Sequence, residues 1–142
     1  MATGILHLHS YFAYIALLMM IILIINSIMG LTSAKTYSET DRKIALFALV
    51  AFHIQIVIGL INYFTSPLGF SNLTGEVMKD SIGRLYGLEH PLINIIAVVI
   101  ATIGYSKAKR SASSQYKFKT LLITFGLALV LVLSRIPWAA WP

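Results

Sequence analysis

The stretch ILHLHSYFAYIALLMMIILIINSIMGL, residues 5–31, decides the fold. It contains no Asp, Glu, Lys or Arg, and the first such side chain in the chain is Lys35. A helix needs roughly 20 apolar residues to cross a bilayer, and this run is longer. We therefore expect a membrane-spanning helix over residues 5–31. A cleavable signal peptide is not expected, because the run is too long and no basic segment precedes it.

Three further apolar segments follow, over residues 44–66, 85–105 and 118–138. The third spans a bilayer only if it begins before Pro91, so this proline either opens the helix near the interface or kinks it. The sequence thus predicts an all-α protein, an integral membrane bundle of four helices. We expect residues 1–142 to form a single transmembrane domain.

The composition supports this class. Of the 142 residues, 58% are hydrophobic and 11% are charged, whereas about 25% are charged in a typical soluble domain. The chain has no cysteine, which excludes disulfides, iron–sulfur clusters and a thiolate nucleophile. Acids are missing from the apolar segments, so a carboxylate proton relay is not expected.

The positive charges predict the orientation. The first and third loops together carry Lys35, Arg42, Lys43, Lys107, Lys109, Arg110, Lys117 and Lys119. The second loop carries Lys79 and Arg84, which Glu76, Asp80 and Glu89 balance. The positive-inside rule therefore predicts that the first and third loops are cytoplasmic. Both termini would then lie on the outer, periplasmic side of a bacterial inner membrane. The net charge of +6 is clustered beside apolar runs, which argues against nucleic acid as a partner.

The four histidines are the residues most able to carry chemistry. His7 and His9 lie in the first outer turns of the first helix, and His90 lies at the outer end of the third. Arg135, about 17 residues or ~26 Å along the fourth helix, reaches the same depth. His53 lies ~16 Å below the outer end of the second helix, near the midplane. Two imidazoles at one depth on two helices are the arrangement that six-coordinate haem iron requires, and haem b needs no cysteine.

The residues around this level suit a flat ligand. Asn94 lies one turn after His90, on the same face of its helix. Gln55 and Gly59 share a face of the second helix, and Gly59 lies at nearly the depth of His9. A glycine there would let a porphyrin lie close to the backbone. The small residues that continue these faces also serve plain helix packing, which is their commoner role.

Several assignments stay open. Arg135 would either pair with haem propionates or extend to the outer surface. His7 could replace His9 as a ligand, because residues two apart on a helix diverge and only one of them can face the haem. His53 is expected to be neutral and hydrogen-bonded to a neighbouring helix, and it is a further alternative ligand.

Two stretches carry a resemblance to a known family. HIQIVIGLINYF, residues 53–64, is followed by an irregular loop and by LEHPLINIIAVVIATIG, residues 88–104. Together they resemble one four-helix half of the haem A synthase family, and also small b-type cytochromes of that shape. The resemblance covers most of the chain as a helix pattern, through short motifs.

The resemblance implies a haem site. In that family a histidine near the outer end of the first helix and another at the outer end of the third hold one haem, and the matching positions here are His9 and His90. A Gln-x-x-x-Gly stretch on the second helix matches Gln55 and Gly59. The family's first-helix motif, a Glu three residues before a His-Arg pair, is absent from ILHLHSYF, residues 5–12. A haem-b-binding scaffold is therefore implied more than haem A synthesis.

These observations lead to three functional hypotheses. The first is a small b-type cytochrome that passes electrons near the outer face, as a subunit of a respiratory complex or as a quinol-linked carrier. The second is an accessory subunit without cofactor, which stabilises a larger membrane assembly. The third is an enzyme of tetrapyrrole metabolism that binds a porphyrin transiently. Replacing both histidines separates the first hypothesis from the second.

Overall fold

The computed structural model describes residues 2–142 and is helical wherever it has regular structure, with no strand among these residues. The long helices are α1 (Ala2–Thr32), α2 (Glu39–Thr65), α4 (His90–Arg110) and α5 (Ser114–Ser134). The short elements are η1 (Phe70–Asn72), η2 (Val77–Lys79), α3 (Ser81–Arg84) and η3 (Leu85–Glu89). α3 and η3 continue directly into α4, and this composite is as apolar and as long as a membrane span. The prediction of four helices able to cross a membrane is thus confirmed.

α2 and α5 begin before their apolar segments, directly after serine residues that cap them. α2 begins at Glu39 because the Ser38 side chain accepts a hydrogen bond from the Asp41 backbone N–H, which forms a capping box. Ser113 caps α5 in the same way through the N–H of Tyr116. At its other end α5 stops at Ser134, four residues before the predicted end. Pro137 explains the early stop, because a proline disfavours helical geometry at the residue before it.

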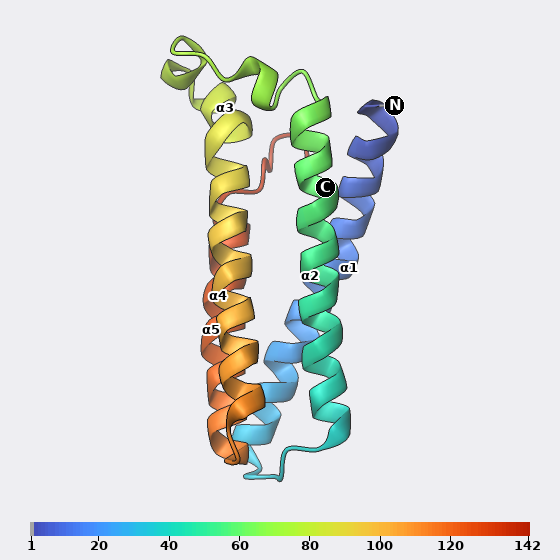
Figure 1. The fold of residues 1–142 in the computed structure, drawn as a ribbon, viewed down its shortest axis with the longest axis vertical. Coiled ribbons are helices and arrows are strands. Elements are labelled where there is room, and N and C mark those ends of the chain that lie inside the picture. Colours follow the sequence, from blue (N-terminus) through green and yellow to red (C-terminus); the bar gives the residue numbers. More distant parts are fainter. Residues whose placement is uncertain (1) are drawn as a thin grey trace.

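The four spans form an antiparallel bundle (Figure 1). α1 packs on α2 and α5, and α4 packs on α5 and α2, so α1 and α4 are diagonal to each other. Both termini and the long loop of residues 66–80 lie at one end, which we call the histidine end. The two short loops, residues 33–38 and 111–113, lie at the other end, which we call the basic end.

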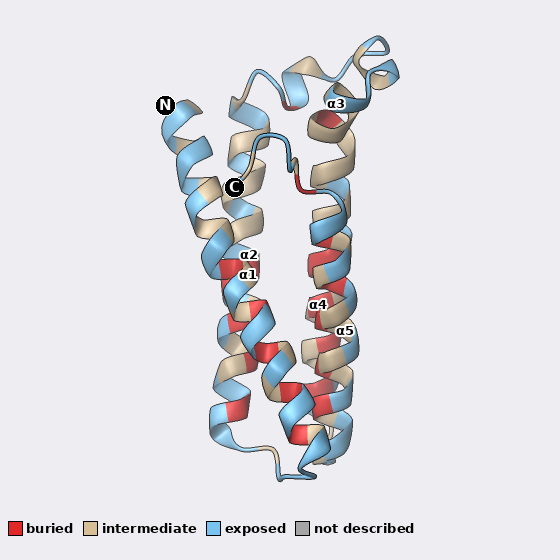
Figure 2. Ribbon diagram, turned by 180° about the vertical axis from the view of Figure 1, so that it is seen from behind, coloured by how far each residue is buried: buried red, intermediate tan, exposed pale blue. Residues whose placement is uncertain are grey.

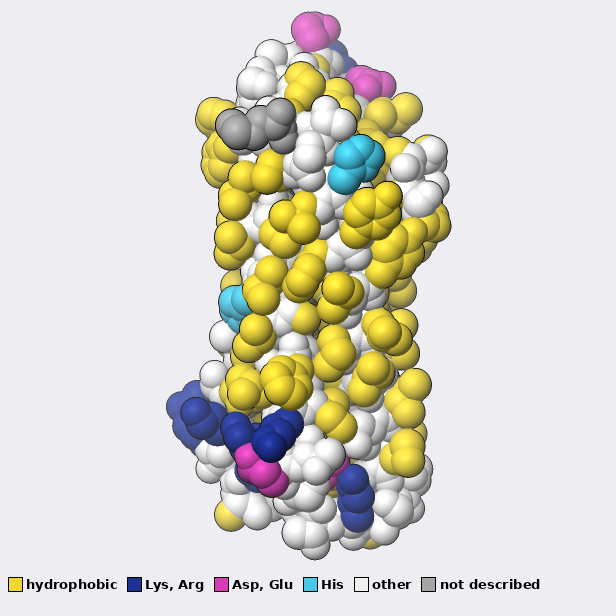
Figure 3. Space-filling model, turned by 90° about the vertical axis from the view of Figure 1, so that its right-hand side faces the viewer, with side chains coloured by type: hydrophobic (Ala, Val, Ile, Leu, Met, Phe, Trp, Pro, Cys, Tyr) yellow, Lys and Arg dark blue, Asp and Glu magenta, His cyan; other side chains and the backbone are white. Residues whose placement is uncertain are grey.

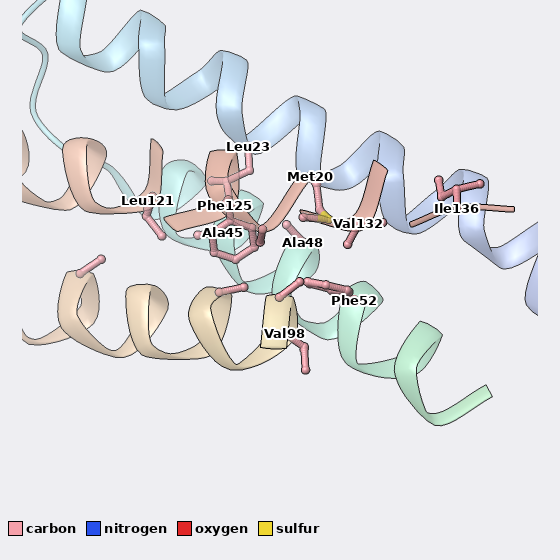
Figure 4. Packing of buried hydrophobic residues seen from close by; sticks show 14 residues of the cluster. Met20, Leu23, Ala45, Ala48, Phe52, Val98, Leu121, Phe125, Val132 and Ile136 are labelled. Carbon is pink, nitrogen blue, oxygen red and sulfur yellow. The ribbon is translucent and has the colours of Figure 1, made fainter. Parts of the chain in front are cut away.

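The buried core is displaced toward the basic end (Figure 2). Among the described residues, none is buried in α1 before Ala16, in α2 after Phe52 or in α4 before Ala97. Side chains of all four spans meet in this core, which includes the fully buried Phe125 (Figure 4). Phe118 of α5 is also fully buried. At the histidine end, less of the helix surface is therefore buried between the helices.

Small residues permit the close contacts in the core. A Cβ on Gly104 of α4 would lie 1.9 Å from Oγ1 of Thr124 on α5, and a Cβ on Gly30 of α1 would lie 2.5 Å from the Phe118 ring. Ala97 and Ala101, which continue the face of His90, are also fully buried. These stripes of small residues thus serve helix packing, which was the plainer of the two predicted roles.

Pro91 is accommodated without a break in the helix. η3, the segment before it, is a turn of π-helix, in which the His90 N–H bonds to the Leu85 carbonyl. Pro91 has no N–H to offer the carbonyl one turn earlier. The Gly87 carbonyl instead accepts a hydrogen bond of 2.8 Å from the Tyr63 hydroxyl of α2. The helix thus begins before Pro91, at Ser81, and the irregularity is a π turn, a feature often found at functional sites.

The surface divides into three zones along the bundle (Figure 3). A broad band of hydrophobic side chains covers the middle, and Lys, Arg, Asp and Glu gather at the two ends. The band includes exposed Leu18, Val57, Val99 and Val130, one from each span. Such a band is what contact with lipid chains requires.

The C-terminal segment, residues 135–142, crosses from α5 back to α1 at the histidine end (Figure 1). The Trp141 indole packs on Tyr14 with ring centroids 4.7 Å apart. Its N–H donates a 3.3 Å hydrogen bond to the Ser10 carbonyl. The segment therefore connects the two helix pairs beside His9.

Candidate functional site

The imidazoles of His9 and His90 lie next to each other inside the histidine end. Their ring centroids are 6.1 Å apart and their planes are nearly perpendicular, at 87°. Both side chains are half-buried. Because α1 and α4 are diagonal in the bundle, the two rings meet across its interior and not along one helix contact.

The Nδ1 atom of His90 is hydrogen-bonded to another part of the chain. This atom donates a 2.7 Å hydrogen bond to the backbone carbonyl of Arg135, just past the end of α5. Asn94, one turn further along α4, donates from Nδ2 to the His90 carbonyl at 2.7 Å. When the Nδ1 proton is used in this way, a neutral imidazole presents its Nε2 lone pair. A backbone carbonyl on the second nitrogen is the usual partner of a metal-ligating histidine.

Gln55 of α2 holds His9. Its Nε2 donates to the His9 carbonyl at 3.0 Å and lies 3.2 Å from the ring Nδ1. Its Oε1 is buried and makes no hydrogen bond. Nε2 is the ring nitrogen of His9 that Gln55 does not contact.

Gly59 lies directly against the His9 ring. A Cβ at this position would lie 2.9 Å from Cε1 of His9 and 3.4 Å from Nδ1. Gly59 is one turn after Gln55, so both residues present the same face of α2 to His9. The glycine lets the imidazole approach the α2 backbone, a role different from the predicted contact with a porphyrin.

Arg135 reaches this level, but its guanidinium has another partner. Its Nε lies 3.3 Å from Oε2 of Glu89, and Oε1 of the same carboxylate accepts from Arg84 at 2.8 Å. Glu89 thus joins two arginines and does not contact the neighbouring imidazole. The contribution of Arg135 to the histidine pair comes from its backbone carbonyl, which no sequence pattern identifies.

The structure does not bring His7 or His53 to the pair. His7 is exposed and stacks on Tyr11, with centroids 6.2 Å apart. His53 is exposed on α2, where its Nδ1 donates to the Leu49 carbonyl at 2.9 Å. Its Nε2 lies 3.3 Å from Oγ1 of Thr102 on α4. His53 therefore links two helices, as the structural interpretation of this residue predicted.

The contacts of two residues near the site were missed by sequence reasoning. Tyr63 completes the hydrogen bonding of the π turn before His90. Trp141 fastens the C-terminal segment to Ser10, the neighbour of His9. In the sequence both look like ordinary interfacial aromatics. Their partners are distant in the chain, and only the folded bundle brings them together.

The two imidazoles of His9 and His90 can be compared with what haem iron requires of its ligands. No cluster of three or more His, Asp or Glu side chains able to hold an ion occurs within residues 2–142. Haem iron needs only two protein ligands, because the porphyrin supplies the other four. A metal–imidazole bond is about 2 Å long, so two imidazoles on opposite sides of one metal hold their ring centroids roughly 6 Å apart. The ring centroids of His9 and His90 have this separation, at 6.1 Å.

Comparison of the chain with protein-family models, with curated proteins and with solved structures found no significant match.

Proposed function

We propose that this chain is a membrane cytochrome that holds one haem b between His9 and His90 and passes single electrons at the histidine end of the bundle. The observation that carries the proposal is the pair of imidazoles from two diagonal helices, whose ring centroids lie 6.1 Å apart. By the positive-inside rule the histidine end is the outer, periplasmic end, in a bacterial inner membrane.

Two features of the surroundings support the proposal. Nδ1 of each ring contacts the protein, at the Arg135 carbonyl for His90 and at the Gln55 amide for His9, so Nε2 is the nitrogen of each ring that remains for a ligand. The residues at this level of α1, α2 and α4 are half-buried or exposed, in contrast to the closed core below them. A flat apolar group between the helices would cover this incompletely enclosed surface, and burial of apolar area is favourable.

The protein's part in the chemistry is to bind and tune. Bound haem supplies one-electron oxidation and reduction. If His9 and His90 both hold the haem, the group would supply electron transfer in preference to chemistry on oxygen. The Nδ1 contacts orient the imidazoles and set their basicity, so they influence the reduction potential. A respiratory complex or a quinol is the kind of redox partner that fits a carrier in the membrane.

The test is a visible spectrum of the detergent-purified protein, isolated under haem-replete conditions, in the oxidised and dithionite-reduced forms. We expect a sharp reduced α-band and a shifted Soret band. Both are expected to be lost in His9→Ala and in His90→Ala, and to persist in the matched controls His7→Ala and His53→Ala. A featureless spectrum of the wild-type protein refutes the proposal.

The second candidate is a cofactor-free accessory subunit of a larger membrane assembly. It is favoured by Gly30, Ala97, Ala101 and Gly104, whose small size is fully explained by contacts within the core. In this case a His9→Ala/His90→Ala double variant is expected to copurify with the same partners as the wild type. Loss of redox activity in that variant, with assembly unchanged, favours the cytochrome.

A further inference from the structure

The whole net charge of the protein resides at the basic end. This end holds Lys35, Arg42, Lys43, Lys107, Lys109, Arg110, Lys117 and Lys119, against only Glu39 and Asp41. At the histidine end Lys79, Arg84 and Arg135 are balanced by Glu76, Asp80 and Glu89. The formal charge of +6 is therefore concentrated beside two short loops.

The two acids at this end are already engaged. Asp41 is 1% exposed and accepts hydrogen bonds from Asn26, Lys35 and Ser38. Glu39 forms two hydrogen bonds with Arg42. Lys109 and Lys117 have no carboxylate within 4.0 Å in the part of the chain that the structure describes. Their charges are therefore available to an external anion.

These two lysines line a cavity of about 70 Å³, several times the volume that one water molecule needs. The other lining residues are Tyr37, Arg42, Tyr105 and Ala108. Lys117 Nζ lies 5.0 Å from the centroid of the Tyr37 ring, which fixes the ammonium group at the wall. Burial and the nearby Asp41 carboxylate raise the pKa of the Tyr37 phenol to about 12, so it stays protonated and can donate.

We propose that this cavity binds the phosphate of an anionic phospholipid headgroup, with Lys109 and Lys117 as its cationic contacts. The cavity lies between α2, α4 and α5, where these helices leave the hydrophobic band. A lipid whose chains lie against that band brings its phosphate to this level. Basic pockets between spanning helices on the cytoplasmic side commonly bind anionic headgroups.

The first part of the test is a titration of the full chain in detergent with phosphatidylglycerol or with phosphatidylcholine, followed by native mass spectrometry. We expect phosphatidylglycerol to bind at least about tenfold more tightly than phosphatidylcholine, because each lysine near a headgroup contributes appreciably. Equal binding of the two lipids overturns the proposal. A third arm uses inorganic phosphate as competitor, and complete displacement of the lipid by millimolar phosphate indicates a free-anion site and overturns the lipid assignment.

The second part compares variants. Lys109→Gln/Lys117→Gln is expected to lose most of the preference for phosphatidylglycerol. The matched control Lys43→Gln/Lys119→Gln removes the same charge from the same end without touching the cavity, and it is expected to keep the preference. Lys109→Arg/Lys117→Arg keeps the charges and should also retain it. Equal loss in the Gln pair and in its control shows a general effect of charge and refutes a specific site.

Discussion

At the scale of single residues, Asp41 is the side chain whose role was least visible in the sequence. It is a carboxylate that is only 1% exposed, although it lies in the charged first turns of α2 beside Glu39 and Arg42. Asn26 Nδ2 and Lys35 Nζ donate to Oδ1, each at 2.9 Å, and the Ser38 N–H and hydroxyl donate to Oδ2, each at 2.8 Å. Asp41 thus joins α1, the first loop and the start of α2. Only in the fold do these donors come together.

We predict that Asp41→Asn lowers the free energy of unfolding by about 1–3 kcal/mol, because an amide presents N–H groups to some of these donors and leaves them buried without an acceptor. Thermal unfolding in detergent, followed by circular dichroism, measures the change. Glu39→Gln serves as the control, since Glu39 forms a solvent-exposed ion pair with Arg42, and such pairs contribute little to stability. Equal effects of the two substitutions contradict the proposed role of Asp41.

The role of Gly59 beside His9 can be tested through haem affinity, independently of overall stability. An added Cβ would collide with the His9 ring, at 2.9 Å from Cε1, and Gln55 holds that ring in place. We expect Gly59→Ala to displace the imidazole and to weaken haem binding by about tenfold or more, since a well-packed site loses about 1–3 kcal/mol on overpacking. A haem titration followed at the Soret band measures this.

The control for this substitution is Gly126→Ala. A Cβ at Gly126 meets no atom within 4 Å, so the haem affinity should stay at the wild-type value. Similar affinities in the two alanine variants would show that the approach of α2 to His9 is unimportant for haem binding.

At the scale of elements, the number and approximate position of the spanning helices could be predicted, because each is a long run without Lys, Arg, Asp or Glu at its centre. The ends of the helices could not be predicted, because the side chains of Ser38 and Ser113 cap α2 and α5 at positions outside the apolar runs. The level shared by His9 and His90 was deduced from helix rise alone. Their contacts with Gln55 and with the Arg135 carbonyl depend on how the helices rotate and pack, which hydropathy does not determine.

The π turn before His90 gives a prediction at this scale. Tyr63 supplies the hydrogen bond that Pro91 cannot give to the Gly87 carbonyl. We expect Tyr63→Phe to cost about 1 kcal/mol of stability in the wild-type background, as expected for a lost hydrogen bond. It should cost less when Pro91 is replaced by Ala, because the new N–H lies one turn from Gly87.

A double-mutant cycle on Tyr63→Phe and Pro91→Ala, measured by unfolding in detergent, isolates this coupling. The same cost of Tyr63→Phe in both backgrounds would show that the phenol and the proline act independently. His90 follows the π turn directly, so the cycle also reports how its helix is held.

At the scale of the whole molecule, the two halves of the bundle differ in packing. The half at the basic end has a closed core, whereas the helices bury few side chains in the half at the histidine end. Local opening is easiest where few apolar side chains are buried. We therefore predict faster amide hydrogen exchange in residues 2–15 of α1 than in residues 16–30, and in residues 53–65 of α2 than in residues 39–52. Hydrogen exchange with mass spectrometry in detergent makes both comparisons within one helix.

Addition of haem should slow exchange in the two faster segments and leave the core segments unchanged. Uniform protection along α1 and α2, with or without haem, would contradict the division of the bundle into two halves.

The even number of spans has a consequence for larger architectures. Both termini lie at the histidine end, so a second copy joined after residue 142 would enter in the same orientation as the first (Figure 1). A tandem duplication of this unit therefore needs no inverted repeat and no additional crossing helix. Its two histidine pairs would lie on the same side and at equal depth, so two haems bound as proposed could exchange electrons along that side.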